Sequence, residues 1–166
     1  LTMLEFDEIE NEIVQGKEYL ENIIKSEIDW FCYPGGKYNQ SITRIAKKYF
    51  KKSRTAGTMR FSKQNKFNID TSFHFYKRGL PSIVKNMCLN DPLILPNLFG
   101  SLTLEYFDIY KNILHELNCK DENFDVHIWG HGWEIEKFNL WEELEDFINF
   151  IVNNNYKVGR MSDIYL

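Results

Sequence analysis

The sequence predicts an α/β fold with a largely parallel sheet, in a single domain that spans residues 1–166. Apolar residues at helical spacing alternate along the chain with short runs of strand-forming residues, which is the order that βα units produce. Residues with unusual backbone freedom or chemistry lie at the ends of three of the predicted strands, at 33–36, 54–55 and 130–133. Because ligands bind beyond the carboxyl ends of parallel strands, this placement indicates a functional site.

The first helix is predicted over residues 6–25, where isoleucines and leucines repeat at helical spacing. Before it, Thr2 and Glu5 have the S/T-x-x-E form of a capping box. A strand over residues 29–33 follows and ends at the Pro-Gly-Gly of residues 34–36, because proline and glycine interrupt regular elements.

The rest of the chain continues the alternation of helices and strands. The predicted elements are a helix over 42–50 capped by Asn39 or Ser41, a strand over 54–58, an extended stretch over 67–76, helices over 80–89 and 102–117, a strand over 124–129, a helix over 141–151 and a weak strand over 158–166. Loops are expected over 91–96 and 118–123.

Composition excludes several classes of protein. The net charge is −4 with both signs interspersed, and without a basic stripe the sequence does not indicate nucleic-acid binding. No apolar run approaches the roughly 20 residues of a membrane span, and no signal peptide opens the sequence. The three cysteines form no C-x-x-C pair, which argues against a zinc knuckle, and their odd number favours a reducing compartment. We therefore expect a cytoplasmic location.

The most unusual stretch is the predicted strand over 124–129 running into Gly130-His131-Gly132-Trp133-Glu134. Glycine on both sides of His131 lets the backbone turn and leaves the imidazole uncovered. A histidine at a strand end, beside an aromatic residue and a carboxylate, suits proton transfer near neutral pH. A buried histidine in a strand-to-helix turn is an equally good interpretation of this stretch alone.

Three stretches of the sequence carry a resemblance to a known family, namely FCYPGGKYN at residues 31–39, Ser53-Arg54-Thr55, and HIWGHGWE at residues 127–134. They resemble motifs of the polysaccharide deacetylases of the NodB-homology type. Residues 31–39 resemble the F-x-Y-P-x-G-x-Y-N stretch of that family, and residues 53–55 resemble the A-R-T strand that follows it. Residues 127–134, HIWGHGWE, resemble the closing H-x-W-G-H-S-W-E motif, and a Trp-bearing helix follows in both. The motifs occur in the family's order over almost the whole chain, although residues 63–120 show little resemblance to it.

The resemblance implies a distorted (β/α) barrel and removal of N- or O-acetyl groups from carbohydrate polymers. In that family a divalent metal, commonly zinc, is held by one Asp and two His, and it activates water and polarises the acetyl carbonyl. A second Asp is the base, a backbone N–H faces the developing oxyanion, and a late histidine protonates the leaving group.

Residue by residue, the resemblance makes His131 the acid and Gly35 the backbone donor near the oxyanion. The substrate-binding residues that it implies are Tyr33, Arg54, Trp129, Trp133 and Glu134, with Trp133 and Glu134 also orienting the His131 ring. His127 is expected to face the barrel wall, and His74 and His115 to be ordinary helix or loop histidines.

The family's early paired aspartates and its H-x-x-x-H metal motif are absent. The sequence therefore looks like the C-terminal portion of a deacetylase, and we expect this chain alone to bind no metal and to lack the base. His127 and His131 are four residues apart on a strand-to-turn segment, which does not place them on one face. Many members also carry Arg where Cys32 stands and Tyr where Gly35 stands. We expect an upstream segment or an oligomer partner to cover the open barrel edge.

Two other functions remain open at this point. One is a non-catalytic or degenerate domain that binds carbohydrate through exposed aromatic rings, since 16% of the residues are aromatic. The other is an unrelated α/β enzyme that uses His131 together with Glu134.

Overall fold

The computed structural model describes residues 1–61, 66–90, 92, 105–119 and 124–165. The chain divides into two compact units. Unit 1 contains the described parts of residues 1–56, 64–70 and 165–166, and unit 2 contains those of residues 57–63 and 71–164. The single domain expected over residues 1–166 stays a prediction.

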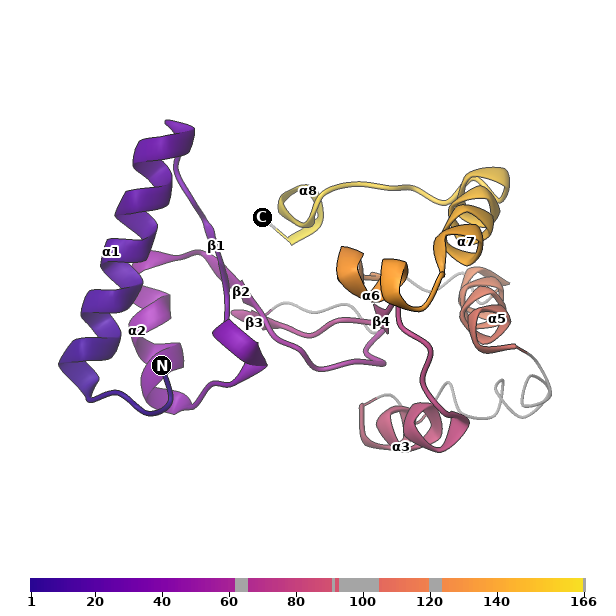
Figure 1. Cartoon of the computed structure of the whole chain (residues 1–166), viewed down its shortest axis with the longest axis horizontal. Helices are drawn as coiled ribbons and strands as arrows, with labels where there is room; N and C mark the ends of the chain where they lie inside the picture. Colours follow the sequence, from indigo (N-terminus) through magenta and orange to yellow (C-terminus); the bar gives the residue numbers. More distant parts are fainter. Residues whose placement is uncertain (62–65, 91, 93–104, 120–123, 166) are drawn as a thin grey trace. The chain divides into compact units, whose positions relative to one another are not determined.

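Unit 1 is built on a three-stranded parallel sheet in the order β1-β2-β3 (Figure 1). The strands are β1 (Trp30–Cys32), β2 (Lys52–Arg54) and β3 (Asn68–Ile69). Phe31 pairs with Ser53, and Arg54 pairs with Ile69. After β1 the chain makes a short 3-10 turn, η1 (Pro34–Gly36), so the predicted break at Pro-Gly-Gly is confirmed.

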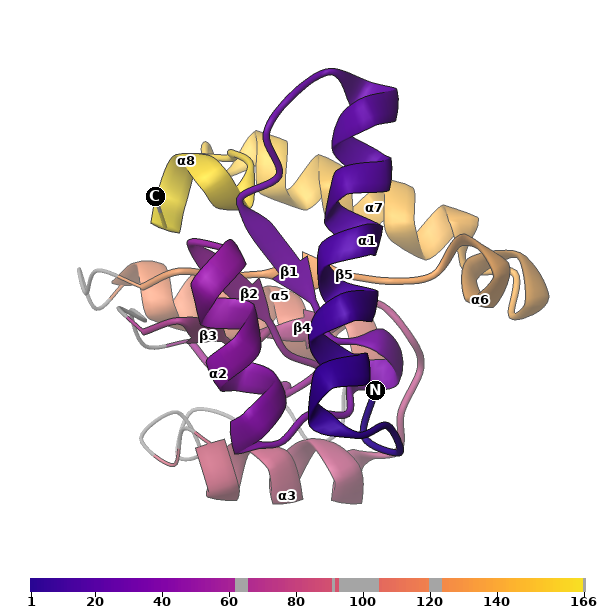
Figure 2. The ribbon, with the colours of Figure 1, turned by 90° about the vertical axis from the view of Figure 1, so that its left-hand side faces the viewer.

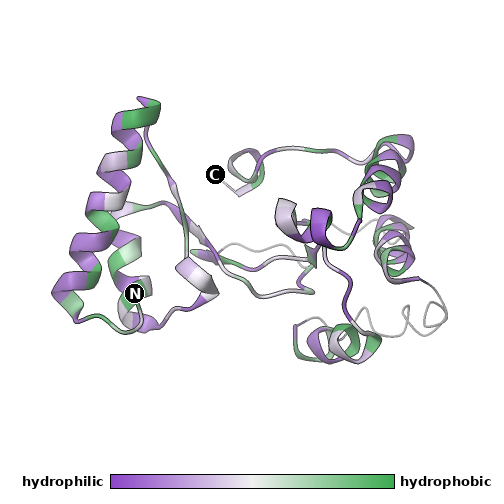
Figure 3. Cartoon of the chain, viewed as in Figure 1, coloured by the Kyte–Doolittle hydropathy of each residue, from purple (hydrophilic) through white to green (hydrophobic). Residues whose placement is uncertain are grey.

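Helices α1 (Phe6–Ile24) and α2 (Gln40–Tyr49) lie side by side in unit 1 (Figure 2). Apolar and polar residues alternate around α1, as the periodicity predicted (Figure 3). The apolar core of the unit consists of Ile9, Ile13, Tyr33, Ile42, Ile45, Ala46 and Phe50.

The caps of the two helices differ in how well the sequence predicted them. The Asn39 side chain accepts a hydrogen bond from the Ile42 N–H at 2.9 Å, which confirms Asn39 as the cap of α2. The prediction that Thr2 caps α1 was wrong. The helix begins at Phe6, and the residue at its cap position is Glu5. The Glu5 N–H donates to the Glu8 carboxylate at 3.0 Å, so the capping box lies three residues further on.

Unit 2 combines a two-stranded parallel sheet with the remaining helices. Its elements are β4 (Phe73–His74), α3 (Leu80–Asn90), α5 (Tyr106–Cys119), β5 (Ile128–Trp129), α6 (Gly132–Lys137), α7 (Trp141–Asn153) and, except for its last residue, α8 (Met161–Tyr165). Phe73 is fully buried, stacks on Tyr110 of α5 with ring centroids 4.0 Å apart, and packs edge-on against Phe147 of α7. This aromatic cluster holds the sheet and two helices together.

The mixed α/β architecture and the parallel pairing are confirmed. Within the described residues the strands form two separate sheets and no closed barrel. The stretch over 67–76 splits into β3 and β4, because Thr71 leaves the strand to bond the Gly57 carbonyl with both its N–H and its hydroxyl. The strand expected over 54–58 ends at Arg54 instead.

The weak strand expected over 158–166 was wrong, since residues 161–165 of this segment form α8. The Asp163 carboxylate accepts from the Arg160 N–H at 2.9 Å, which closes the first turn. Most of the loop expected over 91–96 and part of that over 118–123 lie outside the described residues. In the described part of the chain, no helix is both long enough and apolar enough to span a membrane.

Candidate functional site

His131 lies where β5 meets α6, as the residue that precedes the helix. Its carbonyl accepts from the Glu134 and Ile135 N–H groups at 3.0 and 3.2 Å, which starts the helix and leaves the side chain exposed. Gly130 precedes it at a crowded point, because a Cβ at that position would lie 3.2 Å from the Phe75 Cβ. The structure therefore places His131 on the surface of unit 2, and the interpretation as a buried histidine does not hold.

Two tryptophans flank the His131 ring. Trp129 meets it edge-on with ring centroids 5.2 Å apart, and Trp133 lies nearly parallel to it at 5.8 Å. Trp133 is 61% exposed, whereas Trp129 is partly buried. Two aromatic rings thus line His131, and Trp133 is the one that faces solvent.

Glu134 is buried and pairs with a histidine from another part of the chain. Its carboxylate oxygen Oε2 lies 2.8 Å from Nε2 of His74, at the end of β4. Parallel pairing of β4 with β5 sets His74 opposite Trp129 and so brings it to the site. The expectation that His74 is an ordinary helix or loop histidine was wrong, because it is a buried strand residue with a specific partner.

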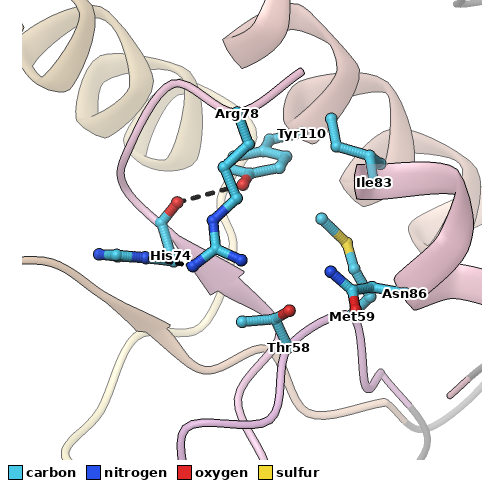
Figure 4. Close-up of a pocket in the computed structure, with 7 residues that line it drawn as sticks. All are labelled: Thr58, Met59, His74, Arg78, Ile83, Asn86 and Tyr110. Carbon is cyan, nitrogen blue, oxygen red and sulfur yellow. Dashed lines mark hydrogen bonds between the residues drawn. The ribbon is translucent and has the colours of Figure 1, made fainter. Parts of the chain in front are cut away.

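The other ring nitrogen of His74 also has a partner. Nη2 of Arg78 lies 2.9 Å from Nδ1 of His74, and Figure 4 shows the guanidinium beside the ring. Since a guanidinium carries only donors, Nδ1 must accept, so the proton of a neutral imidazole is on Nε2. Burial lowers the pKa of His74 below its usual value despite Glu134, and Arg78 and His131 add to that effect. His74 is therefore neutral and donates to Glu134.

The His74 ring is fixed from its flat side as well. It stacks on Trp129 with ring centroids 3.9 Å apart and planes 4° from parallel. The Trp129 indole N–H in turn donates to the Thr71 hydroxyl at 3.1 Å. Both ring nitrogens and one ring face of His74 are thus engaged.

His74, His131 and Glu134 each offer one ligand atom, and these atoms lie within 4.8 Å of one another. Two histidines and a carboxylate are a zinc-like donor set. However, a metal on Nε2 of His74 would leave the proton on Nδ1, where it would point at the donors of Arg78. Histidine ligands instead use their second N–H to donate to an acceptor. The hydrogen-bond polarity around His74 therefore does not fit a divalent metal.

The pocket on the Arg78 side of His74 is lined by residues from several elements of unit 2 (Figure 4), namely Thr58, Met59, His74, Arg78, Ile83, Asn86 and Tyr110. It has no room for a water molecule. We conclude that these side chains support His74 and do not form a ligand site.

The other predicted site residues belong to unit 1. Tyr33 is only 2% exposed, and its hydroxyl donates to the Asn68 side chain at 2.8 Å and accepts from Ser53 at 3.2 Å. The exposed ring beside Tyr33 is that of Tyr38, which stacks on Tyr33 with ring centroids 4.4 Å apart. In this structure Tyr33 is a core residue, and Tyr38 presents the aromatic face to solvent.

Gly35 is exposed and has a positive φ of 63°, which favours glycine in this turn. Arg54 directs its guanidinium to the sulfur of Cys32, with Nη2 3.0 Å from Sγ. Gly35, Arg54 and Tyr33 thus lie together at the carboxyl ends of β1 and β2 in unit 1, whereas His131, Trp129, Trp133 and Glu134 form a second group in unit 2.

The two remaining histidines lie away from the cluster around His131. His115 is exposed on α5, as expected for an ordinary helix histidine. His127 precedes β5, and its carbonyl accepts from the Ser72 and Phe73 N–H groups at 2.9 and 3.1 Å.

Sequence reasoning missed His74 and Arg78 as parts of the site. They are more than fifty residues from His131 and lie in the stretch that matched no motif. The signal that could have found them is the H-x-x-x-R spacing directly after a strand, combined with the pairing of that strand with β5.

Comparison with known proteins gives one match. Residues 1–51 match the family model of the polysaccharide deacetylases, which supports an assignment of the N-terminal part of the chain to that family. The matched part contains α1, β1, η1 and α2 of unit 1. No curated protein and no solved structure shows a significant match to the chain.

Proposed function

We propose that the protein is a carbohydrate deacetylase that hydrolyses N- or O-acetyl groups of a sugar polymer, with His131 as the acid. The observation that carries this proposal is the family match over residues 1–51. It is supported in unit 2 by the exposed His131 between two tryptophans, on the HIWGHGWE segment that resembles the family's closing motif.

Each group in this chain has a defined task in the proposed reaction. His131 carries a proton on its ring and passes it to the amine or alkoxide that leaves the acetyl carbon. The Gly35 N–H donates to the oxygen that becomes negative during attack. Trp133 offers an exposed ring on which a sugar face can stack, and Trp129 forms the inner wall.

In the complete protein we expect the divalent metal, zinc by family resemblance, and the base to come from residues other than those described here. This division is consistent with the hydrogen-bond polarity at His74, which does not fit a metal. We further propose that the two parallel sheets are parts of a distorted (β/α) barrel, completed by an upstream segment or a partner.

The test is acetate release by the complete protein from N- and O-acetylated oligosaccharides, with zinc, cobalt or manganese supplied. We expect His131→Asn to reduce turnover by about 10² to 10⁴, the usual contribution of a general acid. The matched control is His115→Asn, which changes an exposed histidine of the same unit and should leave turnover unchanged. Absence of acetate release with every metal would refute the enzymatic proposal.

The second candidate is a carbohydrate-binding domain without catalysis. It is favoured by one observation, namely that the hydrogen-bond polarity around His74 does not fit a metal while Trp133 remains 61% exposed. It predicts glycan binding that a chelator leaves unchanged and that Trp133→Ala weakens. Trp141→Ala removes another exposed tryptophan of unit 2 and should have no effect. Binding that survives Trp133→Ala would remove this candidate.

A further inference from the structure

We propose that Arg78 and His74 are positioning residues, which form a hydrogen-bond chain that holds the Glu134 carboxylate beside His131. The proposal rests on the proposed function only in taking His131 as the reacting group. Its elements are the contacts from Arg78 to Nδ1 of His74 at 2.9 Å and from Nε2 of His74 to Glu134 at 2.8 Å.

The donor-to-acceptor direction of the hydrogen bonds from Arg78 through His74 to Glu134 is fixed by chemistry. Arg78 can only donate, and an ionised carboxylate can only accept, so a neutral imidazole between them must accept on Nδ1 and donate on Nε2. A positive charge at one end and a negative charge at the other both favour this polarity. The chain therefore has one arrangement of protons and cannot reverse while both ends keep their charge.

The surrounding packing holds His74, the middle residue of the hydrogen-bond chain, in place. His74 is 6% exposed and stacks on Trp129, and the Tyr110 hydroxyl donates to its carbonyl at 3.1 Å (Figure 4). The Tyr110 hydroxyl is itself hydrogen-bonded to the Tyr106 hydroxyl. Helix α5 thus fixes the His74 backbone, while β5 fixes the ring.

The hydrogen-bond chain ends at Glu134 and so determines where a negative charge lies relative to His131. Glu134 is 7% exposed, and its carboxylate lies within 4.8 Å of a ring nitrogen of His131. At that separation one water molecule can bridge the two groups. Because the backbone of α6 and the donor on His74 both restrain Glu134, the carboxylate is held within reach of the His131 ring.

The first test reads the proton directly and does not depend on activity. Long-range ¹H–¹⁵N NMR of the full chain at pH 7 should show His74 as a neutral imidazole protonated on Nε2. His115, exposed on α5, is the internal reference. A His74 protonated on Nδ1, or on both nitrogens, would overturn the proposal.

The second test uses acetate release by the complete protein with two substitutions of His74. His74→Gln keeps a side-chain donor for Glu134 and should retain most of the turnover. His74→Phe removes it and should lower kcat by about tenfold to a hundredfold with KM unchanged, the scale expected when a reacting group is misplaced. Equal turnover of the two variants would overturn the positioning role. If the wild-type protein releases no acetate, the proposed function fails, while the NMR result still decides the hydrogen-bond chain.

Discussion

The pair formed by His74 and Glu134 should contribute measurably to the stability of unit 2. Glu134→Leu leaves the buried Nε2–H of His74 without its acceptor, which should lower the free energy of unfolding by about 1–3 kcal/mol. His74→Phe leaves a buried carboxylate without its donor, which should lower it by about 3–5 kcal/mol. The double variant removes both groups, so its loss should be smaller than the sum by about 1–3 kcal/mol.

The measurement is a double-mutant cycle from urea unfolding followed by tryptophan fluorescence. Glu134→Gln belongs in the series, because its amide oxygen can still accept from His74, and it should cost only about 1 kcal/mol as a charged bond becomes a neutral one. The matched control pair is Lys48 with Glu10, an exposed ion pair at 2.9 Å in unit 1, whose coupling should stay below about 1 kcal/mol. Additive losses at His74 and Glu134 would refute the reasoning.

Three further outcomes follow from the structure. The pKa of His74 in the folded chain lies below the value of about 6.5 for an unfolded histidine, so its contribution to stability is complete above about pH 6.5 and is lost as the pH falls below that value. Urea midpoints measured from pH 5 to 8 should show this decrease in stability, and His74→Phe should make the decrease smaller. Gly36→Ala should lower the thermal midpoint, since Gly36 has a φ of 69° and its new Cβ would lie 2.7 Å from the Cβ of Ala56. Gly16→Ala should raise the free energy of unfolding by about 0.5–1 kcal/mol, because Gly16 lies within α1 with open space around it. Equal effects of the two substitutions would contradict the backbone strain assigned to Gly36. Asn39→Ala should cost about 0.5–2 kcal/mol by removing the cap of α2, and Asn39→Gly only a few tenths, so equal losses in calorimetry would argue against the capping bond.

The sequence predicts most of unit 1 because its elements follow from local patterns. The periodic isoleucines of α1, the Asn39 cap and the Pro-Gly-Gly break each determine structure within a few residues. The errors arise where side chains compete with a pattern. Asp163 closes a helical turn in a segment that reads as a weak strand, and Thr71 interrupts an extended stretch by bonding Gly57.

The site was predictable on one side only. The glycines around His131 indicate an exposed imidazole, and Trp133 directly after them supplies its neighbour. His74 and Arg78 were not predictable in the same way, since their place depends on which strand pairs with β5. Only that pairing shows that Glu134 bonds His74, and only the fixed donors of Arg78 show which nitrogen carries the proton.

The role of His131 as the acid is tested most directly by how the loss of turnover on substitution of His131 depends on the leaving group of the substrate. An acid is needed to expel the amine or alkoxide of a sugar, but not the stable phenolate of p-nitrophenyl acetate. We predict that His131→Asn, in the complete protein, lowers turnover of an acetylated oligosaccharide by about 10² or more and leaves turnover of the aryl ester nearly unchanged. Equal losses on both substrates would contradict the account.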